Sequence, residues 1–391
     1  MSREKPLEKY IPIRNKDLDD WLDAVVANRP EGTSSGTLGG LQPDTNALSS
    51  PSSTVESSTA TTYISEASSP KWFDSADTDH PSYRADTLGT NGIEIRSSRK
   101  SFPPEVRDHV FATRTGQPFP EVSINQMDAW LDELDRLQRS ATEEHLKAFI
   151  TKVILPDDSD PAYGLPVTSV TGEGAMMLPH LIPKNADSPF YLRPPLPNML
   201  YGYSGHRADG GFTSSQLITQ TVMKRGEKRF PQATCCGLRF PFLTIETKDA
   251  GSRKGDHWVA ANECAGASAA CVNAVERLNS LLKEHKSTHR VDGIVYSLAV
   301  DINVAMLYVS WQDDEKEGGM YNLQLAGTFL LSRPDDLERL RRQMRNIMDW
   351  AREKRLRQIQ DALDILAEKL TLGQKHEGGR KDSMYSVYSL E

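Results

Sequence analysis

The chain has 391 residues, a formal net charge of −8 at pH 7 and 38% hydrophobic residues. This length allows one large domain or two, and the negative charge argues against a protein that coats nucleic acid without sequence preference. No stretch approaches 18 apolar residues and no apolar run follows the first residues, so we expect no membrane span, no secretory signal, and an intracellular protein of the nucleus or cytoplasm.

The four cysteines do not follow the spacing of a zinc site. They are Cys235, Cys236, Cys264 and Cys271. We therefore expect reduced thiols, as in a nuclear or cytoplasmic protein.

The first 103 residues divide into two segments. In residues 1–30, a short amphipathic helix is predicted over 15–27, because Leu18, Trp21, Leu22 and Val25 fall on one face. This helix either docks a protein partner or packs back on the core. Residues 31–70 contain 18 Ser or Thr among 40 and hardly any large apolar side chains. Such a segment cannot bury enough apolar surface to offset chain entropy, so we predict a disordered linker over 31–103.

The folded domain is predicted over 104–372, followed by a polar tail over 373–391. Apolar residues at helical spacing predict helices over 124–154, with a second segment opened by the residues from Ser140 to Glu144. Extended segments are expected around 166–170, 189–192 and 199–203. A short helix is expected over 213–223, capped by Thr213 or Ser214.

A glutamate and a lysine stand two residues apart at the end of an apolar run. Residues 240–245 predict a buried strand, and Glu246 and Lys248 then share one face of it while Thr247 points to the other. Such a pair either holds Mg²⁺ and offsets charge on a phosphate, or forms a weak surface ion pair.

The rest of the domain alternates between helices and strands. A long helix rich in small residues is predicted over 258–285, a hairpin over 293–300 and 303–310 with Asp301 near its turn, and a strand over 321–330. A final helix over 335–370 carries several arginines. These arginines either contact phosphates or form a solvated face.

Three segments resemble the PD-(D/E)xK, restriction-endonuclease-like superfamily, and more closely an uncharacterised fungal family of PD-(D/E)xK nuclease-like proteins. The segments are residues 196–203, 240–248 and 261–271, and the resemblance covers roughly residues 120–365. It implies an α/β fold with a restriction-endonuclease-like core, in which a central mixed sheet is flanked by helices. It also implies catalytic roles for Glu246, Lys248 and Glu263, and a site for Mg²⁺ or Mn²⁺ formed by Glu246, Asn198 and Glu144.

Asn198 departs from the pattern of this superfamily, which has an aspartate at that position. An amide oxygen can coordinate Mg²⁺ but brings no charge, so metal binding should be weakened. Asp209 is an alternative second acid if the chain folds back. Phosphate contacts are expected from four basic residues, Lys224, Arg225, Arg253 and Lys254.

Two functions follow as hypotheses. The first is a metal-dependent DNA phosphodiesterase with a weakened site. The second is a catalytically inactive nuclease fold that binds nucleic acid or a protein partner.

Overall fold

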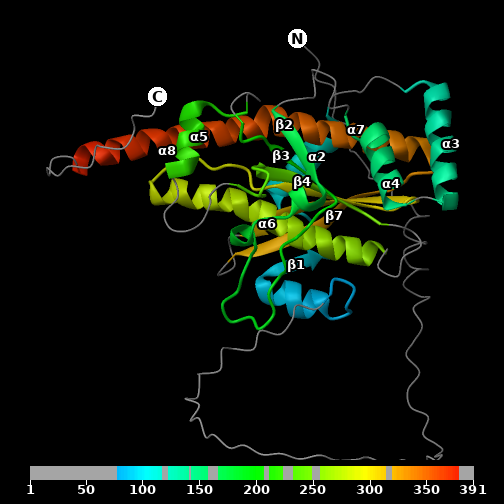
Figure 1. Ribbon diagram of the computed structural model, residues 1–391, viewed down its shortest axis with the longest axis horizontal. Helices are drawn as coiled ribbons and strands as arrows, with labels where there is room; N and C mark the ends of the chain where they lie inside the picture. Colours follow the sequence, from blue (N-terminus) through cyan, green and yellow to red (C-terminus); the bar gives the residue numbers. More distant parts are fainter. Residues whose placement is uncertain are drawn as a thin grey trace, which may run out of the picture. The chain divides into compact units, whose positions relative to one another are not determined.

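A seven-stranded mixed β-sheet lies between helices on both of its faces (Figure 1). The computed structural model describes residues 77–116, 122–140, 142–156, 166–206, 211–222, 232–248, 256–313 and 319–377. The strands are β1 (Ile93–Arg96), β2 (Val167–Thr171), β3 (Met199–Tyr203), β4 (Arg239–Thr247), β5 (Val295–Val300), β6 (Val304–Asp313) and β7 (Met320–Leu330). Their order across the sheet is β1-β7-β6-β5-β4-β3-β2.

The pairing of the strands follows from how the chain connects them. β3 pairs antiparallel with both β2 and β4, and β6 pairs antiparallel with both β5 and β7. β4 and β5 are parallel, and the chain passes between them through a long helix, as a parallel pair requires. β1 adds to the edge in parallel with β7.

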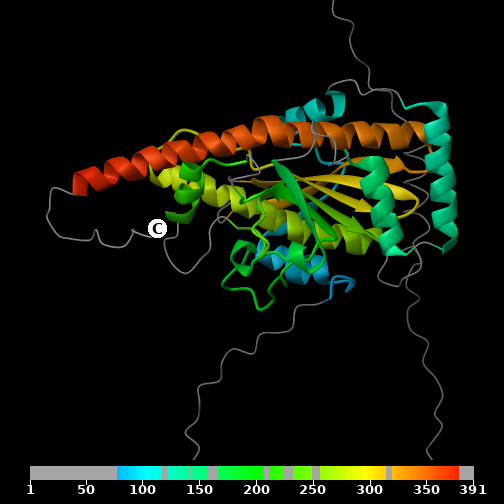
Figure 2. The same cartoon turned by 45° about the horizontal axis from the view of Figure 1, so that its top comes forward.

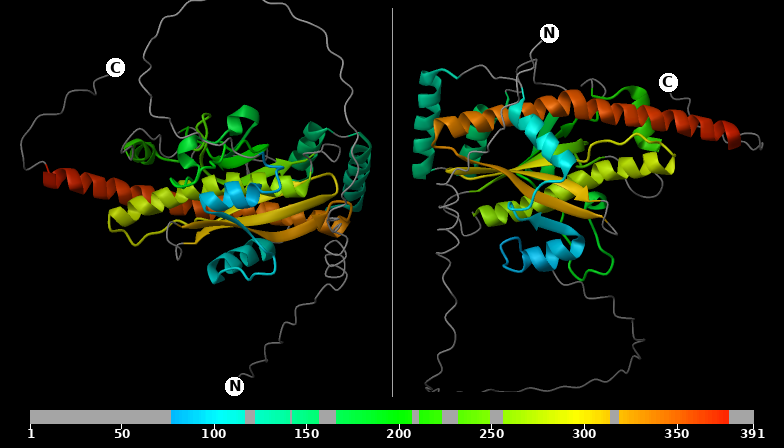
Figure 3. Two further views of the ribbon diagram at one scale, coloured as in Figure 1. Left: turned by 90° about the horizontal axis from the view of Figure 1, so that it is seen from below. Right: turned by 180° about the vertical axis from the view of Figure 1, so that it is seen from behind.

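One face of the sheet is covered by α6 (His257–Glu284), which passes over β4 and β5. The Asp256 side chain accepts a hydrogen bond from the Val259 N–H at 2.8 Å and caps the helix. A run of alanines and Gly266 removes bulk from this helix, so its backbone packs closely on the sheet. The short turns η1 (Arg84–Leu88) and η2 (Gly89–Asn91) lie beside β1 at the edge of the sheet, and η1 also contacts α6 (Figure 3).

The other face is covered by one continuous helical rod. It consists of α7 (Pro334–Trp350), the π-helical turn η7 (Ala351–Arg355) and α8 (Leu356–Glu377), and Figure 2 shows it running along the sheet. α2 (Pro104–Thr115) packs beside α7. Trp350 lies edge-on to Phe242 and Tyr296, with ring centroids 6.4 and 6.0 Å apart, and these contacts join the rod to the sheet.

The remaining helical segments are short, apart from α3, and pack around the sheet and its covering helices. They are α3 (Ile124–Ser140), α4 (Glu143–Phe149), η3 (Ile150–Ile154), η4 (Gly172–Ala175), η5 (Pro179–Leu181) and α5 (Ser214–Val222). α3 and α4 stand together at one end (Figure 1). Thr213 and Gln216 hydrogen-bond reciprocally, which caps α5 as the sequence predicts.

The predicted fold class is confirmed, since the described residues form an α/β protein with a mixed sheet flanked by helices. The domain boundary predicted at residue 104 is wrong, because residues 77–103 contain η1, η2 and β1 and so belong to the fold. No strand forms over 189–192. The predicted helix over 15–27, residues 31–76 of the predicted linker and residues 378–391 of the tail lie outside the described residues.

None of the helices in the described ranges has both the length and the apolar composition needed to cross a membrane. The four cysteines are free, Cys235 and Cys236 being exposed and Cys264 and Cys271 buried.

Candidate functional site

The carboxyl end of β4 carries the candidate site. β4 lies between β3 and β5 near the middle of the sheet, and its apolar residues are buried on both faces. Glu246 is only 3% exposed, so a carboxylate lies within the core at the point where the strand ends. Lys248 follows directly after the strand, and its backbone N–H donates to the Val300 carbonyl at 2.9 Å.

Glu246 and Lys248 lie on the side of β4 that faces α6, where they form a charged cluster with Glu263. We call Glu246, Lys248, Glu263 and Thr78 the α6-side network. The ammonium group of Lys248 forms an ion pair with Glu263 Oε2, and the two side chains are 15% and 28% exposed. The Thr78 hydroxyl donates to Glu263 Oε1 at 3.3 Å. The structure therefore brings Glu246, Lys248 and Glu263 together.

Burial dominates the electrostatics of this network. It raises the pKa of Glu246 well above its usual value of about 4.5, and the charge of Glu263 raises it further, while Lys248 and a backbone hydrogen bond from Asn198 oppose the shift. Burial alone would lower the pKa of Lys248, but Glu263, with smaller effects of Glu246 and Glu143, raises it above its usual range. Lys248 is therefore held as a cation chiefly by Glu263.

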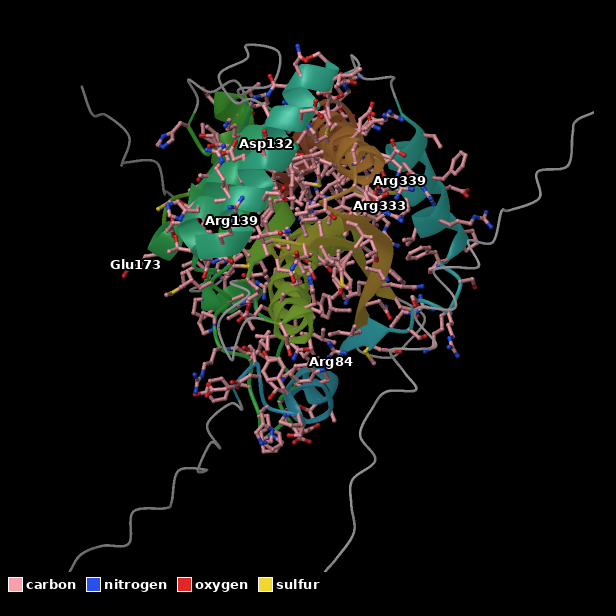
Figure 4. The ribbon with its side chains drawn as sticks, turned by 90° about the vertical axis from the view of Figure 1, so that its right-hand side faces the viewer. Arg84, Asp132, Arg139, Glu173, Arg333 and Arg339 are labelled. Atoms are coloured by element: carbon pink, nitrogen blue, oxygen red, sulfur yellow. The ribbon has the colours of Figure 1, made fainter. Side chains whose placement is uncertain are left out.

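A segment before residue 104 partly covers the α6-side network. The Arg84 Nε donates to Asn262 Oδ1 at 2.7 Å, and its guanidinium lies 4.8 Å from the centre of the Trp258 ring. The Asn262 amide in turn donates to the Thr78 carbonyl at 2.8 Å. Figure 4 shows Arg84 on the turn that lies against α6. We call residues 77–91 the covering segment.

Asn198 belongs to a second cluster, which lies on the opposite side of β4 and involves α4. We call Asn198, Thr247, Glu143 and Lys147 the α4-side network. Asn198 Oδ1 accepts hydrogen bonds from the Thr247 N–H at 2.6 Å and from its hydroxyl at 3.0 Å. Asn198 Nδ2 donates to Glu143 Oε1 at 2.5 Å, and Lys147 Nζ lies 3.3 Å from the same oxygen. Thr247 thus points away from Glu246, as the strand period predicts.

Glu144 was predicted as the helix glutamate of the site, and the structure places Glu143 there instead. The Glu144 side chain is 80% exposed and forms an ion pair with Lys147 at 2.9 Å. Adjacent residues of a helix point about 100° apart, so only one of the two can face β4. Glu143 stands three residues before the buried Leu146 and shares its face, and this spacing is a signal in the sequence that identifies the correct residue.

The residues present do not fit a Mg²⁺ or Mn²⁺ ion. Both acceptor positions of Asn198 Oδ1 are used within the protein, and Glu143 accepts from three neighbours. Glu246 and the Asn198 side chain belong to networks on opposite sides of the strand. Within the described part of the chain, no three side chains of His, Cys, Asp or Glu come together as potential ligands of a metal ion. Mg²⁺ requires several oxygen ligands in close to octahedral geometry.

Sequence reasoning missed an ion pair beside Lys248. Asp301 follows β5, and its Oδ2 lies 3.0 Å from His257 Nε2 at the first residue of α6. Its Oδ1 accepts from the N–H groups of Asn303 and Val304, both at 2.7 Å. Burial would raise the pKa of Asp301, but His257 and these two N–H groups lower it below its usual value. The pair ties the β5–β6 turn to the start of α6.

The predicted nucleic-acid-binding residues Lys224, Arg225, Arg253 and Lys254 lie outside the described residues, as does Asp209. The described residues on either side of positions 223–231 lie near Arg239, the first residue of β4. Gln220 accepts a hydrogen bond from Arg239, and Gln232 pairs with it in a β-bridge. That end of β4 is opposite to Glu246. The 249–255 gap, by contrast, begins directly after Lys248 and ends before Asp256.

The fold and the site define an α/β protein with two polar networks at the end of a central strand. The chain belongs to the family described as "Domain of unknown function (DUF7924)", whose family model matches residues 131–363. The matched range begins within α3 and ends within α8, so it includes both networks except Thr78. No curated protein matches the sequence.

Proposed function

We propose that this chain is a PD-(D/E)xK nuclease-like protein whose metal-binding arrangement has been replaced by the two closed networks, and that it acts as a binding module that does not cut. The observation that carries this proposal is the position of Asn198. Its amide bridges Thr247 and Glu143 through short hydrogen bonds, so the residue serves to join β3, β4 and α4.

The order of the elements supports the relation to the nuclease superfamily. A helix with an inward glutamate, α4, precedes three antiparallel strands, and α6 then leads to the parallel strand β5. Asn198 directly precedes β3, and Glu246 and Lys248 stand at the end of the neighbouring β4. This agrees with the order helix, strands, Glu-x-Lys strand and helix that the resemblance implies.

Nucleic acid is the partner that the basic residues in the sequence after β4 favour. Arg253 and Lys254 stand in the sequence between Lys248 and Asp256, which both belong to the site end of the sheet. A small number of cations at one place can bind phosphate although the net charge of the chain is −8. A protein partner that binds through residues 15–27 is the alternative.

Calorimetry and cleavage assays on the full chain test the loss of catalysis. We expect no heat of binding for millimolar Mg²⁺ or Mn²⁺, and no cleavage of plasmid or single-stranded DNA. Asn198→Asp should gain Mn²⁺ binding, because its carboxylate would face that of Glu143. Asn125→Asp on the exposed start of α3 should not. Metal binding or cleavage by the wild type would overturn the proposal.

Fluorescence anisotropy with labelled DNA tests the choice of partner. The double variant Arg253→Ala/Lys254→Ala should weaken binding about tenfold at 0.1 M salt, since each lost phosphate contact removes counterion release. Lys283→Ala, which removes an exposed cation at the far end of α6, should leave it unchanged. Equal binding by the wild type and the double variant would favour the protein partner.

A metal-dependent phosphodiesterase is the second candidate function, because Glu246 and Lys248 keep the residue types and spacing that the superfamily uses. For that function, the wild type would have to cleave DNA in the presence of Mn²⁺, and Lys248→Ala would abolish cleavage.

A further inference from the structure

A polar pocket lies at the end of the sheet opposite to Glu246. It has a volume of about 770 Å³ and is bounded by η2, by the residues from η5 to Asn185, by α6 and by the start of β7. Arg277 of α6 lines it, 14 positions after Glu263, which is about 21 Å along the helix axis. The pocket is therefore separate from both networks.

Side-chain amides join the walls of this pocket to one another. Asn91 Nδ2 donates to the Phe190 carbonyl at 2.8 Å, and Asn185 Nδ2 donates to the Thr90 carbonyl at 3.0 Å. Asn273 Nδ2 donates to the Leu181 carbonyl at 2.8 Å and fixes α6 to η5. These hydrogen bonds fix the positions of the walls relative to one another, so the pocket is formed before any ligand enters.

Two left-handed glycines shape the floor of the pocket. Gly92 and Gly319 have φ of +74° and +68°, which favour glycine. The Tyr321 N–H donates to the Gly92 carbonyl at 2.8 Å, so the two turns meet where β1 begins to pair with β7. A Cβ at Gly319 would overlap the Gln312 side chain.

The charge within this pocket is positive. Arg277 and Lys184 both line it, and neither forms an ion pair or a hydrogen bond with another of the described residues. Arg277 is half-buried, and burial lowers its pKa, with Tyr321 opposing the shift. None of the residues that line the pocket is acidic. A partly buried guanidinium there is best stabilised by an anionic ligand, and its planar fork matches phosphate or carboxylate oxygens.

We propose that this pocket binds a small phosphorylated ligand of nucleotide size, with its phosphates at Arg277 and Lys184 and its ring against Ile182 and Tyr321. The volume is within the range of about 300–1,000 Å³ typical of small-molecule sites and is far larger than a single phosphate needs. The apolar side chains among the lining residues provide a surface for a flat ring. Phosphate is favoured over carboxylate because two separate cations can each contact a different oxygen of a diphosphate.

Calorimetry on the full chain tests this proposal. The ligands are four nucleoside diphosphates (ADP, GDP, CDP and UDP), the matching nucleosides and pyrophosphate. At least one diphosphate should bind more than tenfold tighter than its nucleoside and than pyrophosphate. EDTA in every sample excludes binding through a metal. If none of the four binds, or if pyrophosphate binds as tightly as the best of them, the proposal is overturned.

Variants then locate the site. Arg277→Ala should weaken binding of the best diphosphate at least tenfold, and Lys184→Ala severalfold. Lys283→Ala on the same helix, outside the pocket, should have no effect. Arg277→Lys keeps the charge and should recover part of the affinity, which separates loss of the cation from loss of folding. Unchanged affinity in a folded Arg277→Ala protein would place the ligand elsewhere and overturn the proposal.

Discussion

Glu246 is the residue whose ionisation should most affect the stability of the fold. Burial raises its pKa in the folded state, so the folded protein holds a proton there that the unfolded chain releases above about pH 4.5. This contribution to stability is complete below pH 4.5 and is lost as the pH rises toward the raised pKa. Each pH unit in that window costs about 1.4 kcal/mol.

Glu246→Gln should therefore remove this pH dependence. The variant should match the wild type in free energy of unfolding near pH 4.5 and exceed it increasingly as the pH rises, because glutamine does not ionise. Urea unfolding at a series of pH values measures both curves. Glu144→Gln, on an exposed side chain, is the matched control and should follow the wild type. Parallel curves for Glu246→Gln and wild type would contradict the expected role of burial.

Arg355 is a fully buried cation that depends on backbone carbonyls. Its guanidinium donates to the carbonyls of Asp292 and Ile294, both at 2.9 Å, and of Pro241 at 3.3 Å, and it lies over the Trp350 ring. Arg355→Ala leaves these carbonyls without a donor and opens a cavity, so the free energy of unfolding should fall by about 3–5 kcal/mol. Arg357→Ala, which removes an exposed side chain two residues later, should stay within about 0.5 kcal/mol of the wild type. Urea denaturation compares the two, and a loss below 1 kcal/mol at Arg355 would contradict this account.

The residues of the site show where sequence reasoning reaches its limit. The strand period placed Glu246 and Lys248 together and Thr247 opposite, and the structure agrees. The choice between Glu143 and Glu144 depends on which face of α4 meets β4, and the spacing of Glu143 from the apolar Leu146 was the signal for it in the sequence. The pairing of Asp301 with His257 joins residues 44 positions apart in sequence, and no local pattern indicates it.

At the scale of elements, strong periodic segments were predicted well and the edge of the sheet was not. The apolar β4, the alanine-rich α6 and the β5–β6 hairpin carry their signal within their own residues. β1 has four residues and follows a Ser- and Thr-rich segment, and it is stabilised by its pairing with β7 more than 200 residues later. Its composition alone therefore resembles that of a linker.

Residues 77–103, which include the covering segment and β1, should be required for full stability. A chain that begins at residue 104 lacks the buried side chains of Tyr83, Leu88 and Ile93 and exposes the free edge of β7. Burying each of these side chains contributes about 1.5–3 kcal/mol, so the shortened chain should lose about 5 kcal/mol or more. Urea unfolding of chains beginning at residues 77 and 104 measures the difference. Equal stability would show that the segment contributes no packing energy.

A substitution that weakens the contacts of the covering segment should also change its hydrogen exchange in the full chain. Arg84→Ala removes the hydrogen bond to Asn262 and the contact with Trp258, so amide hydrogen exchange should become faster in residues 77–91 and in the first turns of α6. Exchange in β5 and β6 should stay unchanged and is the internal control. Uniform acceleration across the sheet would instead indicate global destabilisation.

At the scale of the whole molecule, the order of the strands prevents a division of residues 77–377 into independent parts. The first strand pairs with the last at one edge, and α6 contacts both β1 and β4. The rod of α7, η7 and α8 contacts β7 at one end and α5, which connects β3 to β4, at the other. Any cut of the chain between these elements therefore breaks contacts on both faces of the sheet.

The described part of the protein should accordingly unfold in one cooperative transition. Circular dichroism at 222 nm reports all helices, while the near-ultraviolet signal reports packed aromatic rings such as Tyr203, Phe242 and Trp350, which lie between the sheet and the rod. The two signals should give the same midpoint in urea. The alanine-rich α6 contributes helical signal but no part of this aromatic cluster, so separate loss of its layer would shift the 222 nm midpoint away from the aromatic one. Two distinct midpoints would show that the layers on the two faces of the sheet unfold independently.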